Sequence, residues 1–393
     1  MFFMFFLGID IAKHNHVASL IDDNGNSIFK ACSFSNSSNG ADSLIDKLKK
    51  YSTDDIIIGM EATGHYWLAL YSYLSEKDFN IIAINPIQTD AWRHATEIRK
   101  RKTDSSDSVL IADFIRFGNF QTSSIADEKY LNLRNMTRFR HSLIKQIGDL
   151  KRKIIANLDL VFPEYSSYFS YIFGQTSKEI LLNFNTAEDF KNLKTRDFEK
   201  VLRNVTLKKS ATIKLNSLKQ MSQSSFGVKF ALSSYSIQIK CLIEQIKVIE
   251  DQAKLIENEI ESIVKDLNTP IFTIPGIGYV TGVVILAELG DINKFSSDKK
   301  IVAYAGLDAT VNQSGQSDGQ HGHLSKRGST HLRKALFQAA LVASTNDTIF
   351  KDFYDKKRKE GKHHLVAVNA VARKMCHVIY AVLKKNEPYV EQK

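Results

Sequence analysis

Two aspartates directly follow a run of four basic residues in the first third of the chain. Asp104 and Asp107 are three positions apart, a spacing that puts both carboxylates on one face of a helix. Two neighbouring anions repel each other unless a cation lies between them, and a divalent metal ion is a common one. The basic run could hold a phosphodiester beside that metal. It consists of Arg99, Lys100, Arg101 and Lys102. The alternative is a solvated charged turn in which Asp104 caps a helix.

Two further acids lie at the ends of predicted strands. Asp10 lies near the end of an apolar strand over residues 2–12, and Glu61 ends another over residues 56–61. Neighbouring strands can bring both acids to one edge of a sheet, where the helix of Asp104 and Asp107 would supply two more. Carboxylate oxygens at this density suit a hard ion such as Mg²⁺, and one or two ions could polarise a phosphodiester. The alternative is that Asp10 and Glu61 only cap strand ends.

The elements that must position these acids follow from the hydrophobic pattern. The pattern predicts strands over residues 2–12, 17–21, 27–34, 56–61 and 80–85, with helices over 41–50 and 66–75. The first three strands form a meander, and the later ones alternate with helices. This order predicts a mixed sheet covered by helices.

Composition favours a polyanionic partner. The chain has 393 residues, which indicates two or three domains, and its formal net charge of +10 favours nucleic acid. Its three cysteines are far apart, so neither a disulfide framework nor a zinc cluster is indicated. The apolar start of the chain is too short to span a membrane and is better explained as a buried strand. We therefore expect a cytoplasmic protein without a membrane partner.

The middle of the chain carries two long heptad patterns. They predict a coiled coil or a long helical hairpin, formed within one chain or between chains. The first pattern comprises Leu133, Met136, Leu143, Ile147, Leu150 and Ile154, with Arg140 at one core position. The second comprises Leu242, Ile246, Ile249, Ala253, Ile256, Ile260, Ile263 and Leu267. Arg138 belongs to a basic strip on the first helix, which is either a solvated surface or a track for phosphates. A small helical insertion is expected between the two patterns.

The last third contains two candidate phosphate sites. Gly276 and Gly278 precede an apolar helix over residues 280–289, and this is either a phosphate-binding helix start or a tight turn. Further on, a polar loop contains Ser314 and Gly315. A basic turn and helix start follow this loop and could hold a phosphate. Their cations are Lys326, Arg327 and Arg333.

The first domain resembles a known family in four short motifs. They are residues 8–13 (Gly-Ile-Asp-Ile-Ala-Lys), 61–64 (Glu-Ala-Thr-Gly), 85–86 (Asn-Pro) and 102–107 (Lys-Thr-Asp-Ser-Ser-Asp). Together they resemble the Asp-Glu-Asp-Asp transposases of the insertion-sequence 110 and 1111 family, which includes the Piv-type invertases. The resemblance implies an RNase H-like domain similar to the RuvC resolvase, and four metal-binding acids that match Asp10, Glu61, Asp104 and Asp107.

The last third resembles the second domain of the same family. There, a serine in a Ser-Gly pair after Gly-Leu is the nucleophile, and the register from Gly306 and Leu307 implies Ser314 in that role, with Ser317 as the alternative. A serine hydroxyl needs activation, which the acidic site could supply. The resemblance also implies DNA as substrate, a structured non-coding guide RNA, and a homodimer or homotetramer.

The expected fold is α/β plus α in three domains. They are an RNase H-like (RuvC-like) metal-binding domain over residues 1–122, a helical coiled-coil region over 123–268, and a mostly helical transposase domain over 269–393. The function expected from all of this is a DNA transposase or recombinase. Two alternatives stay open: a metal-dependent nuclease that resolves branched DNA by water attack, and a non-catalytic nucleic-acid-binding protein.

Overall fold

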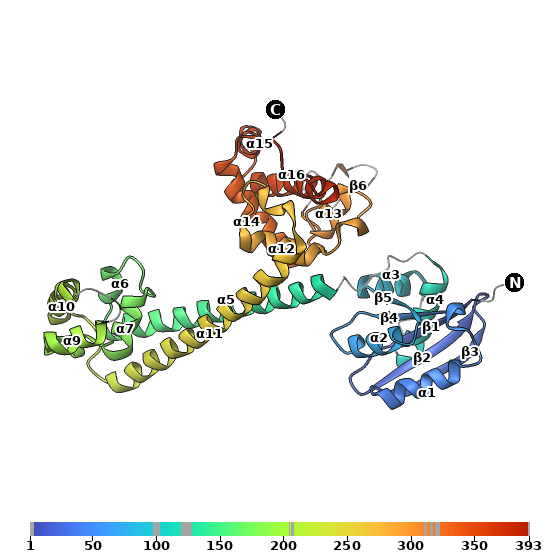
Figure 1. The fold of residues 1–393 in the computed structure, drawn as a ribbon, viewed down its shortest axis with the longest axis horizontal. Helices are drawn as coiled ribbons and strands as arrows, with labels where there is room; N and C mark the ends of the chain where they lie inside the picture. The colour runs from blue at the N-terminus through green and yellow to red at the C-terminus, as the bar shows by residue number, and fades with distance from the viewer. Residues whose placement is uncertain are drawn as a thin grey trace. The chain divides into compact units, whose positions relative to one another are not determined.

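The chain folds into two compact units. The computed structural model describes residues 4–96, 103–118, 128–203, 205, 208–309, 313–314, 317–318 and 323–391 (Figure 1). The first unit is Met1–Ile125 and the second is Ala126–Lys393. The division into three domains that the sequence suggested stays a prediction.

A five-stranded mixed sheet forms the centre of the first unit. Its order is β3-β2-β1-β4-β5. The strands β1, β2 and β3 form an antiparallel meander, whereas β4 is parallel to β1 and β5 is parallel to β4. The mixed sheet predicted from the sequence is therefore present. Its strands are β1 (Phe5–Asp10), β2 (Asn15–Asp22), β3 (Ser27–Ser35), β4 (Ile56–Glu61) and β5 (Asn80–Ile84).

Helices cover both faces of this sheet because the strand residues alternate between two cores. Leu7, Ile9 and Met60 belong to a core that includes residues of α1 and α2. Phe6 and Ile84 belong to a second core, which includes residues of α4. Successive strand residues point to opposite faces, so this alternation identifies the face on which each residue lies. The helices of the unit are α1 (Ser38–Leu48), η1 (Thr53–Asp55), α2 (Trp67–Ser75), α3 (Pro86–Thr96) and α4 (Asp104–Arg116).

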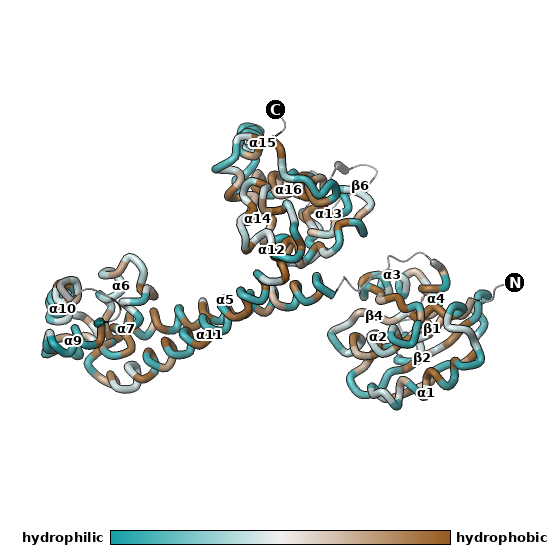
Figure 2. The backbone as a smooth tube through the Cα atoms, in the orientation of Figure 1, coloured by the Kyte–Doolittle hydropathy of each residue, from teal (hydrophilic) through white to brown (hydrophobic). Residues whose placement is uncertain are grey.

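Two long antiparallel helices run through the second unit. Helix α5 (Glu128–Val161) packs along α11 (Leu232–Leu267) within one chain (Figure 1). Hydrophobic and hydrophilic residues alternate along both helices (Figure 2), as expected for helices with one buried face. Arg140, at a predicted core position, donates from Nε to Glu257 Oε1 on α11 at 2.6 Å. The predicted helical hairpin is present, whereas a supercoil stays a prediction.

A small helical cluster lies between the two long helices in sequence. It shares a core with the adjoining parts of α5 and α11, including Ile154 and Ile243. This cluster is the helical insertion that the sequence predicted. Its helices are α6 (Tyr165–Tyr168), α7 (Gln175–Asn183), α8 (Ala187–Lys191), α9 (Thr195–Leu202) and α10 (Lys208–Gln223).

The C-terminal helices form another core of the second unit, together with the ends of α5 and α11 that lie away from the small helical cluster. Leu133 and Ile260 of the long helices belong to this core. Helix α16 is long and apolar enough to cross a membrane by length and composition, but its buried residues, such as Met375, pack in the same core. Besides short 3-10 turns η2 (Pro270–Thr273) and η3 (Ile292–Lys294), the elements are α12 (Tyr279–Leu289), α13 (Asp298–Tyr304), β6 (Gln313–Ser314), β7 (Ser317–Asp318), α14 (Thr330–Asn346), α15 (Thr348–Lys359) and α16 (His364–Lys385).

Candidate active site

Asp10 and Glu61 are the last residues of two neighbouring strands. The strands β1 and β4 are parallel, and their register pairs Gly8 with Gly59 and Ile9 with Met60. The next position of this register contains Asp10 and Glu61, which are both half-buried. Adjacent strands are about 4.8 Å apart, so the two acids are direct neighbours at one end of the sheet.

Both acids lie on the face of the sheet that α4 covers. A Cβ on Gly8 would meet Ser108 O at 2.0 Å, and one on Gly59 would meet Ile115 Cγ2 at 2.9 Å. Because strand residues alternate between faces, Asp10 shares the face of Gly8, and Glu61 shares the face of Gly59. The two glycines permit α4 to lie directly on the strands that end in these acids.

The first turn of α4 is directed toward the same end of the sheet. Arg116, the last residue of α4, donates from Nη1 to Asp23 O at 3.4 Å. Asp23 follows β2, whose last residue Asp22 pairs with Phe5 at the start of β1. Helix α4 therefore runs antiparallel to β1, and its start is at the end of the sheet that carries Asp10. All four predicted acids share one end and one face of the sheet.

The start of α4 places Asp104 and Asp107 differently. Thr103, not Asp104, is the N-cap: it forms a capping box with Ser106, and Asp104 is the exposed first residue of the helix. Asp107 is buried, and its Oδ1 accepts a hydrogen bond from Arg93 Nη1 of α3 at 2.6 Å. An unpaired buried carboxylate is costly, and Arg93 provides the partner that Asp107 needs at this buried position.

The four acids are not grouped as a metal site in the structure. Among the described residues, which include all four acids, no three His, Cys, Asp or Glu side chains are grouped so that they could hold a metal ion. The carboxylate of Asp107 is paired with the Arg93 guanidinium. The donors themselves fit a hard divalent ion, since four carboxylates at one sheet end offer only oxygen ligands.

The predicted nucleic-acid contacts have different surroundings. The run from Arg99 to Lys102 lies outside the described residues. Arg138 donates from Nε and Nη2 to the two carboxylate oxygens of buried Glu288, at 2.7 and 2.9 Å. Arg138 therefore links α5 to α12, and its contact with nucleic acid stays a prediction. Lys326 and Arg327 are exposed.

The two candidate serines lie on a short hairpin. Ser314 on β6 pairs with Ser317 on β7 in antiparallel register. Below the hairpin, the chain returns on itself through a bridge between Ala309 and Leu324. Ser325 N donates to Asp308 O at 2.9 Å, which continues this pairing toward the helices. The serines are therefore carried by a two-stranded stem.

The base of this stem depends on close backbone packing. Gly306 has φ +65°, and a Cβ on Gly328 would lie 1.8 Å from Tyr304 O. Arg333 Nη1 donates to Ala305 O at 3.2 Å, and Arg373 Nε donates to Leu307 O. Arg333, predicted to contact nucleic acid, thus holds the base of the stem. Its predicted contact with a phosphate is untested.

Sequence reasoning missed two charged residues of these regions. Arg93 lies on α3, for which the hydrophobic pattern predicts no helix. The first residue of α3 is Pro86, and proline favours the first position of a helix. Glu288 is the one acid in the apolar sequence of α12, which is a signal for a buried partner. Burial alone raises the pKa of Glu288, but hydrogen bonds from Arg138 and Ser329 outweigh it and leave the pKa lowered.

Family models match both ends of the chain. One described as a transposase matches residues 7–163, which contain all four acids. Another, described as a transposase of the IS116/IS110/IS902 family, matches residues 268–355, which contain Ser314 and the cations that follow it. The two matches together span more than half of the chain.

Relatives match over most of the chain as well. A pilin gene-inverting protein of Moraxella bovis is 25% identical over 387 residues, covering 98% of this chain and 97% of the relative. The 42 kDa protein of insertion element IS900 from Mycobacterium paratuberculosis is 24% identical over 73% of each chain. The IS1111A transposase of Coxiella burnetii is 33% identical over 30% of this chain and 33% of the relative. The chain therefore belongs to the IS116/IS110/IS902 family of transposases, enzymes that cleave and rejoin DNA.

Proposed function

We propose that this transposase cuts and rejoins DNA with a metal site formed by Asp10, Glu61, Asp104 and Asp107, and with Ser314 as the nucleophile. The shared position of the four acids, at one end and on one face of the sheet, is the observation that supports the proposal most. The strand order, a meander followed by parallel strands, also supports the RNase H-like fold that the sequence resemblance implied.

The acids would act by holding one or two Mg²⁺ ions at the sheet end. When bound, such ions supply positive charge that stabilises the oxygens of a phosphodiester as one bond forms and another breaks. Asp107, which accepts a hydrogen bond from Arg93, would hold the ions together with Asp10, Glu61 and Asp104.

Ser314 would form a covalent link with DNA. Its Oγ attacks the phosphorus atom, a serine–phosphate ester forms, and the bond from phosphorus to the leaving oxygen breaks. The serine hydroxyl gives up its proton, and the leaving oxygen takes up a proton, so a free hydroxyl end results. A hydroxyl end of another strand then attacks the ester, which rejoins DNA and restores the serine. Activation of the serine is assigned to the acidic site.

The proposal includes partners that the family resemblance implies. A structured non-coding RNA would select the sites, and a homodimer or homotetramer would carry out the exchange. The net charge of +10 supports binding to a polyanion. Arg99, Lys100, Arg101, Lys102, Lys326 and Arg327 are the cations assigned to phosphate contacts.

Trapping the protein on DNA tests this proposal directly. The full-length chain is mixed with the DNA ends of its element and Mg²⁺, denatured, and the phosphate-carrying residue is mapped by mass spectrometry. We expect the phosphate on Ser314, and we expect Ser314→Ala to abolish the adduct. Ser317→Ala is the matched control, because Ser317 lies directly across the same hairpin.

Two results would change the assignment. An adduct that persists in Ser314→Ala but disappears in Ser317→Ala would move the nucleophile across the hairpin. Strand cleavage that proceeds undiminished without any adduct would contradict serine chemistry and favour water attack by a metal-dependent nuclease.

A further inference from the structure

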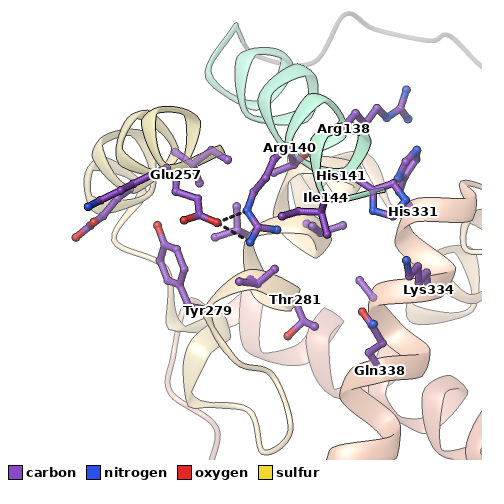
Figure 3. A pocket seen from close by; sticks show the side chains of 18 of the residues that line it. Arg138, Arg140, His141, Ile144, Glu257, Tyr279, Thr281, His331, Lys334 and Gln338 are labelled. Carbon is purple, nitrogen blue, oxygen red and sulfur yellow. Dashed lines mark hydrogen bonds and ion pairs between the residues drawn. The ribbon is translucent and has the colours of Figure 1, made fainter. Parts of the chain in front are cut away.

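A cavity of about 490 Å³ lies within the second unit, between α5, α11, α12 and α14. Figure 3 shows side chains from all four helices pointing toward it. None of the four acids, nor either candidate serine, lines this cavity. Its volume is in the range of small-molecule sites, which is roughly 300–1,000 Å³.

Cationic and imidazole side chains from two helices line one side of the cavity. His331 and exposed Lys334 come from the first turns of α14, and His141 comes from α5. The rings of His141 and His331 are 5.1 Å apart and perpendicular. Burial lowers the pKa of His141, and the positive charges of Lys334 and its neighbours lower it further. This side of the cavity is therefore electropositive and suited to an anion.

The acids of the cavity do not cancel this charge, because each has its own partner. Glu257 is paired with Arg140 at 2.6 Å across the two long helices (Figure 3). Glu261 is paired with Lys265 at 2.9 Å. Lys254 adds a further cation to the α11 wall. A ligand of this cavity would face an excess of positive charge.

Exposed apolar side chains also line the cavity. Ile144 of α5 is 44% exposed, and Tyr279 and Val280 of α12 are 45% and 49% exposed. Exposed apolar side chains that gather in a concave site indicate a ligand with an apolar surface. The ring of Tyr279 is held by stacking on Phe272 at 5.6 Å, so it offers a fixed flat surface.

We propose that this cavity binds one unpaired nucleotide of a nucleic-acid strand. The base packs against Ile144, Tyr279 and Val280, and the adjoining phosphate binds Lys334 and His331. A nucleotide fits this mixed lining, because it joins a flat, largely apolar base to an anion. A DNA strand and an RNA strand offer the same chemistry. The site does not depend on the acids or the serine, so it can be tested separately from the proposed reaction.

Binding of short labelled oligonucleotides to the full-length chain tests the phosphate contact. The probes are single-stranded oligodeoxyuridylate and oligouridylate, and fluorescence anisotropy gives the affinity. Lys334→Ala is expected to weaken binding about tenfold, which corresponds to about 1.4 kcal/mol, because it removes a charge-assisted contact with the phosphate. The matched control is Lys351→Ala, which removes the same charge from exposed α15. It is expected to change affinity less than about twofold.

A second variant separates a nucleotide from a simple anion. Ile144→Ala removes apolar surface at a half-exposed position and should weaken oligonucleotide binding about threefold to tenfold. It should leave competition by pyrophosphate unchanged, whereas Lys334→Ala should weaken both. The tighter of the DNA and RNA probes identifies the source of the strand. A photoreactive base in that probe should crosslink to the peptide that contains Tyr279.

The proposal would be overturned by either of two outcomes. One is that Lys334→Ala and Ile144→Ala bind both oligonucleotides as Lys351→Ala does, with no crosslink to the Tyr279 peptide. The other is that Lys334→Ala weakens pyrophosphate and oligonucleotide alike while Ile144→Ala changes neither, which would make the cavity an anion site only.

Discussion

The acid cluster of the first unit and the serine stem of the second are positioned in different ways. Regular elements position the acids: Asp10 and Glu61 end neighbouring strands, and Asp107 lies in the first turns of α4. The serine stem instead depends on irregular backbone contacts, with Gly328 against Tyr304 and Arg373 on the carbonyl of Leu307. Strand register therefore sets the positions of the acids, whereas a few individual contacts set the positions of the serines.

This difference predicts which changes affect which site. A change in a carboxylate should remove chemistry without disturbing the fold, because the strands that carry it are held by the sheet. A change at the base of the serine stem should disturb structure first, because glycine and arginine contacts hold it. The variants below separate the two regions on this basis.

The largest effect is expected from Asp10→Asn. The substitution keeps the shape of the side chain but removes the charge that would hold a metal ion. Cleavage of element DNA should fall on the order of a thousandfold, since a bound ion contributes several kcal/mol of charge stabilisation. Gel assays of strand cleavage at saturating Mg²⁺ measure this effect.

Asp113→Asn is the matched control for this experiment. Asp113 is another carboxylate of the first unit, but it lies on α4 and pairs with Arg116 at 2.7 Å, at the end of the helix away from Asp104. Cleavage by this variant should stay close to that of the native chain. An equal loss of activity in both variants would mean that removing either charge acts through the fold of the first unit and not through a metal site at Asp10.

Two glycine substitutions test how close backbone packing stabilises the acid cluster and the serine stem. A Cβ on Gly8 would lie 2.0 Å from Ser108 O, and one on Gly328 would lie 1.8 Å from Tyr304 O. Each alanine variant should lose about 3 kcal/mol of unfolding free energy, because backbone atoms must move apart. Gly8→Ala should also impair metal binding, whereas Gly328→Ala should leave metal binding intact. Urea unfolding and Mn²⁺ titration measure the two effects.

Gly278→Ala is the control for these steric effects. Among the described residues, no atom apart from Gly278 itself and its two chain neighbours lies within 4 Å of the Cβ position at Gly278. The Gly278→Ala variant should lose less than about 1 kcal/mol of unfolding free energy, since only a helix cap position changes. A loss as large as that of Gly328→Ala would show that steric contact is not the reason for the effect.

A smaller effect is expected from the buried pair of Glu288 and Arg138. Contacts with Arg138 and Ser329 outweigh burial and lower the pKa of Glu288 below 4.5, its ordinary value. A lowered pKa in the folded state adds stability above that ordinary value, and this stability is lost as the pH falls through the folded pKa. Glu288→Gln should therefore flatten the loss of stability on acidification, as measured by urea midpoints at several pH values.

The same pair gives a second measurement near neutral pH. Arg138→Ala leaves the buried carboxylate of Glu288 without its main partner. This variant should lose about 3 kcal/mol of unfolding free energy. A loss below about 0.5 kcal/mol would contradict a structural role for Arg138 and restore it as a free nucleic-acid contact.

The sequence predicted the elements of the first unit well because their hydrophobic patterns are regular. The strand predicted over residues 56–61 has those bounds as β4, and Asp104 begins α4. The sequence also predicted that Asp10 and Glu61 lie at one edge of the sheet, because the strands that carry them can be neighbours. Register, which decides that these two acids are direct neighbours, could not be derived from periodicity alone, because it depends on pairing between distant segments.

The hydrophobic pattern does not predict which polar side chains contact each other. Arg93 meets Asp107 only because α3 and α4 pack together, and α3 was not predicted. Arg138 was predicted on a basic surface strip, but Glu288 on α12 binds it from 150 residues away. The base of the serine stem depends on the close approach of Gly328 and Tyr304, which no spacing rule indicates. Such contacts depend on tertiary packing, so only a structure can identify them.

Direct measurement of bound metal tests the central claim, that Asp10, Glu61, Asp104 and Asp107 together form a divalent-ion site. Mn²⁺ binding to the full-length chain is followed by electron paramagnetic resonance, and Asp10→Asn is compared with Asp113→Asn. We expect Asp113→Asn to bind Mn²⁺ as the native chain does, whereas Asp10→Asn should lose at least about tenfold in affinity. Equal Mn²⁺ binding by both variants and the native chain would contradict the acidic metal site.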